Sequence, residues 1–230
     1  MSDYDGFAPI YDAWSAGMTE DIDFYVELAR EADGPIVELA VGTGRVAIPI
    51  AQQTGKRVIG IDSSPAMLAV ARERAAAIGV ELDLRKGDML DLSLEAAFDL
   101  VICPYRALLH LPTWADRRRV FERVAAALRP GGRFAWNAFV YDFGVASRID
   151  GRWQNEPVLH RVDNVPADNR VDIMVENGPS VSLWWVSRGE WEGLIDVSGL
   201  EREALYGWFD RRPFDEDSRE FVWVARKPAG

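Results

Sequence analysis

The regular alternation of short apolar runs with amphipathic stretches, from residue 36 onwards, is the feature that most constrains the fold. The apolar runs read IVELA, VIGID, VELDLRKGD, FDLVICP and RFAWNAF. Stretches with helical spacing follow three of them, over about residues 45–54, 65–78 and 114–128. Strands and helices that alternate in this way form a parallel sheet with helices on both faces. The chain is therefore predicted to adopt an α/β fold.

Two of these helices carry recognisable end signals. Ser64 and Pro65 stand where a capping side chain and a first-turn proline begin a helix. The segment Arg129-Pro130-Gly131-Gly132 ends the helix predicted over 114–128. The apolar stripe of that helix, which should face the sheet, consists of Val120, Phe121, Val124, Ala125 and Leu128.

An N-terminal helical cap is predicted before the core. Aromatic side chains recur there at three- and four-residue intervals, which is the spacing of an amphipathic helix: Tyr4, Phe7, Tyr11 and Trp14. A second helix follows at about 19–31. Residues 1–33 should therefore pack as a pair of helices outside the sheet.

Beyond the core, which is predicted to span residues 34–149, the pattern changes. Residues 150–186 alternate polar and apolar residues between turn sequences, which predicts an antiparallel insertion. Residues 187–230 then supply a helix at about 188–198 and the strands that complete the sheet. With 230 residues, 48% of them hydrophobic, the chain suits one domain with one sizeable core.

The charge balance narrows the classes of partner. A net charge of -11, from 37 acidic and 26 basic residues, repels phosphate backbones and anionic lipid surfaces. The apolar runs are shorter than the roughly 18 residues that span a bilayer, and the acidic start does not resemble a secretory signal. We therefore expect a cytoplasmic protein that binds neither nucleic acid nor membranes.

Cys103 is the only cysteine and lies inside an apolar run. A single thiol can form neither an internal disulfide nor a cysteine zinc site, so a buried, unreactive side chain is predicted. We expect no metal cofactor.

The segment from Ile36 to Arg45 is a strand that runs into a glycine turn and opens a helix. Glycine belongs where the backbone turns sharply and a ligand must approach it closely. Taken alone, Gly42, Gly44 and Ala47, with Asp62 twenty residues beyond Gly42, also fit a dinucleotide-binding fingerprint. The turn by itself therefore predicts a nucleotide-like ligand without identifying it.

The ordered features around this turn resemble the class I S-adenosylmethionine-dependent methyltransferases. Glu38, Gly42 and Gly44 match the first motif of that family, and Ala40 replaces its first glycine. Asp62 ends a segment that resembles the family's second strand. Three more family segments follow in order: Gly87-Asp88-Met89, Phe98-Asp99-Leu100-Val101 and Leu128-Arg129-Pro130-Gly131-Gly132.

This resemblance covers about residues 36–139 and implies a Rossmann-like, mostly parallel sheet of seven strands whose last strand is antiparallel. It implies S-adenosyl-L-methionine as cofactor, with Asp62 at the ribose hydroxyls and Asp88 at the adenine amino group. The implied cofactor-binding residues are Glu38, Ala40, Gly42, Gly44, Asp62, Ser63, Met67, Asp88, Met89 and Pro104. Structural alternatives stay open: Asp62 could cap a helix, Asp88 could be a turn residue, and the two methionines could fill the core.

Two residues are candidates for the acceptor side. His110 follows the fourth strand, where the family places substrate-facing residues, and its ordinary pKa near 6.5 suits a general base. A histidine bonded to backbone in a helical turn is the alternative. Tyr11, on the N-terminal cap, is expected to face His110 across the acceptor site, with the cofactor methyl between them.

Other polar and aromatic residues have weaker support as residues of the acceptor site. Asn137 and Phe139 end the fifth strand and could face the acceptor or pack in the core. His160 lies in the insertion and is predicted to be structural. Six of the nine tryptophans lie beyond residue 150; they could wall off an apolar acceptor site, fill the core or form an oligomer contact. The insertion over residues 150–186 is predicted to cover the acceptor side of the cofactor.

The predicted activity is methyl transfer to a nitrogen or oxygen of a small molecule. The Tyr11-Asp12 segment, His110-Leu111 and the insertion resemble small-molecule methyltransferases, including amino-sugar and glycine N-methyltransferase relatives. A dinucleotide-dependent oxidoreductase, a non-catalytic cofactor-binding protein and a protein methyltransferase are the alternatives. Whether the chain forms a homo-oligomer stays open.

The motif set predicts which ligand stabilises the protein. S-adenosylhomocysteine at about a hundred times its dissociation constant should raise the free energy of unfolding by about 2.7 kcal/mol, because it binds only the folded state. NAD should have no effect. Melting curves with each ligand test this, and a rise with NAD alone would favour the oxidoreductase.

Overall fold

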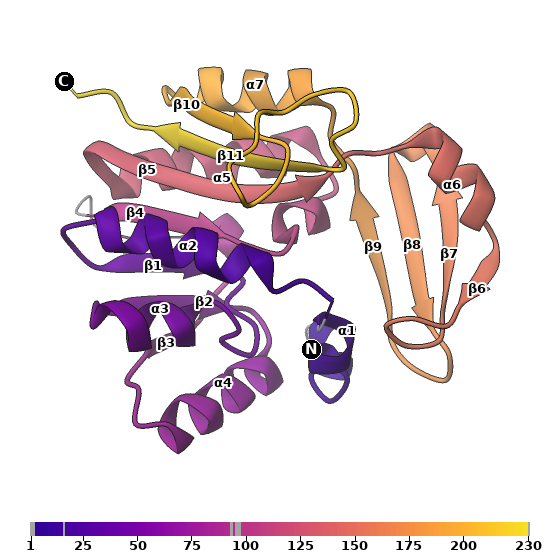
Figure 1. The fold of residues 1–230 in the computed structure, drawn as a ribbon, viewed down its shortest axis with the longest axis horizontal. Helices are drawn as coiled ribbons and strands as arrows, with labels where there is room; N and C mark the ends of the chain where they lie inside the picture. The colour runs from indigo at the N-terminus through magenta and orange to yellow at the C-terminus, as the bar shows by residue number, and fades with distance from the viewer. Residues whose placement is uncertain (1–2, 16, 93, 95–97, 230) are drawn as a thin grey trace.

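The computed structural model describes residues 3–15, 17–92, 94 and 98–229, and its main layer is a seven-stranded sheet in the order β10-β11-β5-β4-β1-β2-β3 (Figure 1). The strands are β1 (Ile36–Leu39), β2 (Val58–Asp62), β3 (Asp83–Lys86), β4 (Phe98–Cys103), β5 (Leu128–Phe139), β10 (Glu201–Tyr206) and β11 (Glu220–Arg226). Neighbours among β1 to β5 run parallel, whereas β11 is antiparallel to both β5 and β10. The predicted fold class is confirmed.

Helices cover both faces of this sheet. On one face, α5 (Trp114–Ala127) and α7 (Arg188–Val197) share a core with Val101, and all five residues of the predicted apolar stripe are buried there. On the other face, α2 (Glu20–Glu31), α3 (Ala47–Thr54) and α4 (Pro65–Ala77) pack with Leu100. Because successive side chains on a strand point to opposite faces, adjacent residues of β4 join different cores.

The helix end signals act much as predicted. The Ser64 hydroxyl accepts a hydrogen bond from the Met67 N–H at 3.2 Å and caps α4. Helix α5 ends at Ala127, but β5 begins at Leu128, so the Arg-Pro-Gly-Gly segment lies inside the strand. A register shift between Phe98 and Leu100 of β4 allows this extension to pair.

The N-terminal cap differs from the prediction in its first helix. The chain forms a 3₁₀ turn, η1 (Asp3–Gly6), and a short helix, α1 (Tyr11–Ser15), in place of one continuous helix. Pro9 explains the break, because it lacks an N–H and disfavours helical geometry at Ala8. Helix α2 occupies the predicted position.

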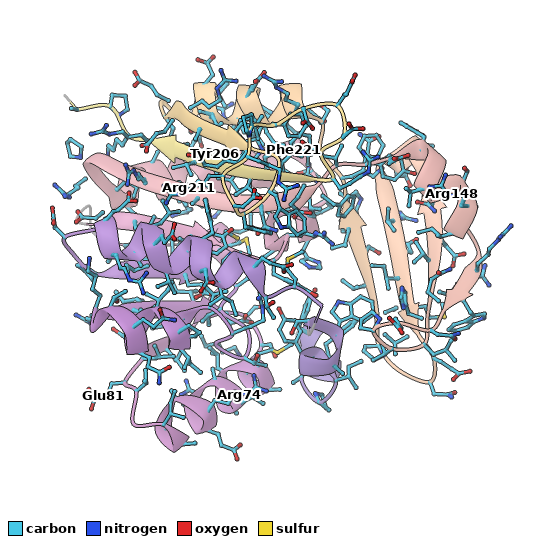
Figure 2. All side chains as sticks on the ribbon, in the orientation of Figure 1. Arg74, Glu81, Arg148, Tyr206, Arg211 and Phe221 are labelled. Atoms are coloured by element: carbon cyan, nitrogen blue, oxygen red, sulfur yellow. The ribbon has the colours of Figure 1, made fainter. Side chains whose placement is uncertain are left out.

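Ion pairs attach α2 to the rest of the fold. The Arg45 guanidinium forms two hydrogen bonds to the buried Asp21 carboxylate, at 2.7 and 2.5 Å. Burial lowers the pKa of Arg45, but Asp21 outweighs this effect and raises it. Arg211, which is labelled in Figure 2, belongs to the loop before β11. Its guanidinium lies 3.4 Å from the Glu27 carboxylate and 3.5 Å from that of Glu31.

The insertion forms a second, four-stranded antiparallel sheet beside the main one (Figure 1). After α6 (Phe143–Ile149) come β6 (Arg152–Gln154), β7 (His160–Val165), β8 (Arg170–Val175) and β9 (Ser180–Trp184). A 3₁₀ turn, η4 (Pro166–Asp168), joins β7 to β8. Figure 1 shows α1 between this sheet and α4.

Several of the aromatic residues prove to be core residues. Trp136 and Trp223 stack with ring centroids 5.9 Å apart, and Trp191 is fully buried beside them. Cys103 is also buried, and burial raises the pKa of its thiol. Among the helices of the described residues, none is long and apolar enough to cross a membrane.

The turn after β1 has three residues in left-handed backbone geometry: Ala40 (φ 54°), Gly42 (φ 54°) and Gly44 (φ 79°). A Cβ on Gly44 would lie 3.0 Å from the Ile48 side chain, so this glycine also permits close packing of α3. Ala40 is the residue in this turn whose Cβ makes left-handed geometry unfavourable.

Ala40→Gly should therefore raise the free energy of unfolding by about 1 kcal/mol, because glycine adopts positive φ without a Cβ clash. Ala69→Gly, at an exposed position inside α4, is the matched control and should lower it by about 1 kcal/mol. Urea denaturation of both variants measures the two changes. A fall in stability for Ala40→Gly would contradict the assignment of strain.

Candidate cofactor and acceptor site

A cavity opens at the carboxyl ends of β1, β2 and β4, where ligands bind in open α/β sheets. It comprises about 690 Å³ of space not filled by protein atoms, part of it open to solvent. Of the twelve predicted site residues, ten line it: Tyr11, Ala40, Gly42, Asp62, Ser63, Met67, Asp88, Met89, Pro104 and His110.

Asp62 joins two strand ends at the edge of this cavity. One of its carboxylate oxygens accepts the Gly42 N–H at 2.8 Å, and the other accepts the Ser64 N–H at 2.8 Å. The side chain therefore holds the glycine turn of β1 against the beginning of α4. It is not the N-cap of α4, because Ser64 has that role.

Asp88 and the two methionines combine structural contacts with positions on the cavity. Asp88 accepts the Leu90 N–H at 2.9 Å and caps the 3₁₀ turn η2 (Met89–Asp91). Met67 is buried and packs against Phe7, yet it also lines the cavity. The structural alternatives considered for these residues are thus compatible with ligand contact.

Two predicted cofactor residues, Glu38 and Gly44, do not line the cavity. Glu38 lies beneath the turn, and its Oε2 has no hydrogen-bond partner among the described residues. Burial raises the pKa of this carboxyl well above its ordinary value, although Arg45 opposes the shift. An unpaired buried carboxyl oxygen beside a ligand cavity suits a positively charged or hydrogen-bond-donating group.

The other side of the cavity carries a tyrosine–histidine pair. His110 ends the 3₁₀ turn η3 (Ala107–His110), and its Nε2 shares a 2.6 Å hydrogen bond with the Tyr4 hydroxyl. The two rings meet edge to face with centroids 5.0 Å apart. Tyr4 was not among the predicted site residues, although it shares the seven-residue helical spacing of Tyr11, which is the signal that could have found it.

Tyr11 also reaches the cavity and covers the glycine turn. Its ring lies 3.8 Å from where a Cβ on Gly42 would be, and it meets the Tyr105 ring edge to face at 6.0 Å. Burial raises the pKa of its hydroxyl, so the phenol stays protonated at neutral pH. Tyr11 can donate or accept a hydrogen bond, but it is not a base.

The insertion borders the site from outside, through the N-terminal segment and through contacts between β9 and η3. None of the described residues in 150–186 lines the cavity, in contrast to the acceptor wall expected there. Its inner face instead packs on the outside of the cap: Val175 contacts the buried Phe7, and the His160 ring meets Trp14 at 5.1 Å. The His160 Nδ1 is 2.8 Å from the Val158 carbonyl oxygen, in keeping with a structural role.

Asn137 and Phe139 likewise lie outside the cavity. The Asn137 side chain is fully buried and bonds to the Tyr25 hydroxyl, the Tyr105 N–H and Glu220. Within the part of the chain that the structure describes, no group of three or more His, Cys, Asp or Glu side chains is arranged to hold a metal ion.

Sequence comparison extends these observations. Residues 36–132 match the model of a methyltransferase domain. A demethylmenaquinone methyltransferase of Thermus thermophilus is 36% identical over 111 residues, which cover 47% of this chain and 49% of the relative. The putative methyltransferase YqeM of Bacillus subtilis is 32% identical over 56% of this chain and 52% of the relative. The chain thus spans about half the length of these relatives.

Structural comparison covers nearly the whole chain. The CcbJ methyltransferase from Streptomyces caelestis has a TM-score of 0.83 and 26% identity, covering 100% of this chain and 99% of the neighbour. A S-adenosylmethionine-dependent methyltransferase from Clostridium acetobutylicum has the same TM-score at 16% identity, covering 99% and 100%. Together with the sheet order and the strand-end cavity, these matches show that the chain contains a methyltransferase domain and has the fold of the class I S-adenosylmethionine-dependent methyltransferases.

Proposed function

We propose that this protein transfers the methyl group of S-adenosylmethionine to a nitrogen or oxygen of a small-molecule acceptor. One observation carries the proposal: a single cavity has the glycine turn and two strand-end carboxylates on one side, and the hydrogen-bonded Tyr4–His110 pair on the other. The first side suits a nucleoside cofactor. The second suits an acceptor that must lose a proton.

The residues on the cofactor side fit S-adenosylmethionine. The carboxylate of Asp62, oriented by its two backbone hydrogen bonds, would accept hydrogen bonds from the ribose cis-diol. Asp88 would accept from the adenine amino group, with Met89 against the ring. Glu38 would face the ammonium of the methionine part through the buried oxygen that lacks a described partner. Since Gly42 has no side chain, a ligand can approach its backbone closely.

The protein has little covalent chemistry to perform. The sulfonium of the bound cofactor supplies an already activated methyl group. The aromatic side chains of Tyr4, Tyr11 and Tyr105 enclose the cavity and would exclude water while aligning the acceptor. His110 would accept the acceptor proton at a ring nitrogen as the acceptor lone pair attacks the methyl carbon and the carbon–sulfur bond breaks.

An amine is the acceptor that this site supports best. A hydroxyl becomes a good nucleophile only when a base takes its proton during the attack. A neutral amine attacks with its own lone pair and loses a proton afterwards. Two similar solved structures are an amino pentose methyltransferase and a glycopeptide N-methyltransferase, which agrees with this choice.

The charge of the cavity restricts the acceptor further. Apart from tyrosines, its titratable lining residues within the described chain are Asp62, Asp88 and His110, so no arginine or lysine pairs with an anionic acceptor. The rings of Tyr4 and Tyr11 can stabilise positive charge as it moves from sulfur to nitrogen. We therefore propose a neutral or cationic amine of a small metabolite.

His110→Ala should lower turnover about a hundredfold or more, in the usual range for loss of a general base, and should leave S-adenosylhomocysteine affinity nearly unchanged. If His110 removes the proton of a protonated amine, the loss should shrink as the pH rises above the pKa of the acceptor, whereas a His110 that only orients the amine should give the same loss at every pH. Screening an acceptor library with labelled cofactor, followed by pH profiles of both proteins, measures this.

His160→Ala is the matched control, because His160 is the other histidine of the chain and lies outside the cavity. It should keep wild-type turnover. Equal activity of His110→Ala and wild type at every pH would eliminate both roles of His110. Cofactor binding without transfer to any small molecule would instead favour a non-catalytic protein or a protein methyltransferase.

A further inference from the structure

The loop that leaves β4 toward His110 begins with two residues in unfavourable backbone geometry. Tyr105 (φ 55°) and Arg106 (φ 64°) are consecutive, and both adopt the left-handed conformation although both carry a Cβ. Such geometry persists where the surrounding structure holds it, and it gathers at functional sites. The contacts of these two residues therefore indicate what fixes the position of the loop.

The Arg106 side chain extends to the last strand of the sheet. Its Nη2 donates to Glu220 Oε2 at 2.7 Å, and its Nε lies 3.1 Å from Oε1 of the same carboxylate. Glu220 is fully buried, so the carboxylate of this ion pair is shielded from solvent, whereas the Arg106 side chain is partly exposed. The guanidinium also lies 5.6 Å from the centre of the Phe139 ring.

A second side chain connects this ion pair to the loop backbone. Asn137 Nδ2 donates to Glu220 Oε1 at 2.7 Å, while Asn137 Oδ1 accepts the Tyr105 N–H at 2.9 Å. The same Oδ1 accepts the Tyr25 hydroxyl at 3.0 Å. Glu220 is thus bonded to one strained residue directly and to the other through Asn137.

Tyr105 extends in the opposite direction, toward the cap. Its hydroxyl donates to the Trp14 carbonyl at 3.2 Å, and the Arg45 guanidinium lies 4.8 Å from the centre of its ring. The loop is therefore held from two sides, by the cap and by β11. Tyr105 itself lines the cavity.

The antiparallel direction of β11 explains why Glu220 can make these contacts. Glu220 is the first residue of β11 and pairs with Phe139, the last residue of β5. An antiparallel strand brings its first residue to the edge where the parallel strands end. The next residue, Phe221, is labelled on β11 in Figure 2.

We propose that the Arg106–Glu220 ion pair is a positioning pair, which holds the loop after β4 in its strained geometry and thereby places His110 against Tyr4 at the acceptor side of the cavity. The link to turnover rests on the proposed function; the link to the position of His110 does not. Neither residue lines the cavity, so both would act through the loop.

The two histidines of the chain permit a direct test. The protein is labelled with ¹⁵N-histidine, and the ring signals of His110 and His160 are assigned with His110→Ala and His160→Ala. Glu220→Gln keeps the shape and the hydrogen bond to Asn137 but removes the charge. Arg106→Lys keeps the charge but loses the two-nitrogen contact. Glu203→Gln is the control for charge removal at an exposed position, because Glu203 pairs with two nitrogens of Arg133 elsewhere on the sheet.

The His110 signals should move in Glu220→Gln and in Arg106→Lys, with the His160 signals unchanged, and neither signal should move in Glu203→Gln. With an acceptor in hand, kcat should fall between about tenfold and a hundredfold, as for a small misplacement of a catalytic group, while S-adenosylhomocysteine affinity stays unchanged. If Glu220→Gln does not fold, the His110 signals of Arg106→Lys decide whether the ion pair positions His110.

Unmoved His110 signals in the folded variants would overturn the positioning role. So would equal shifts of His110 and His160, because these would report a general loosening of the fold. If wild-type protein transfers no methyl group to any acceptor, the proposed function fails, yet the histidine spectra still decide whether the ion pair positions His110.

Discussion

The hydrogen bond from the Gly42 N–H to the Asp62 carboxylate is the contact on which the cofactor half of the structure depends. It joins the ends of β1 and β2, two parallel neighbours whose connecting helix returns the chain to the other edge of the sheet. It supports the left-handed turn at Ala40 and Gly42 from β2, together with the hydrogen bond from the Val41 N–H to the Ile61 carbonyl. The same carboxylate also orients the beginning of α4 through Ser64. A single, partly buried acid at the end of β2 thus organises two turns and lines the cavity.

The acceptor half is assembled from parts that are remote in the chain. Tyr4 and His110 meet across 106 positions, and Arg106 and Glu220 across 114. Both contacts depend on the cap and the last strand reaching the same sheet edge as the loop after β4. The site is therefore most sensitive to how these segments dock, and least sensitive to the central strands, whose cores are closed on both faces.

The insertion supports this half from outside. Its inner face covers Phe7 and Trp14, which places the cap between the small sheet and the cavity. Arg117, buried on α5, donates to the Trp184 carbonyl at 2.9 Å and anchors the end of β9 to the main fold. An aromatic-rich segment can thus serve a site without touching its ligand, because it buries the outer face of the segment that does.

The sequence by itself determined the α/β class, most helix and strand positions, and most of the residues that line the cavity. These follow from short-range properties: the period of apolar residues, the glycine turn and an acid at a strand end, each read within a few residues. The sequence also contains the reason for the break in the N-terminal helix, which is Pro9, but the helical spacing of the aromatic residues favoured one continuous helix. Only the tertiary structure brought Tyr4 to His110, joined Glu220 to Arg106 and set the insertion behind the cap. Those contacts depend on which distant surfaces bury each other, and the spacing of residues along the chain carries no information about that choice.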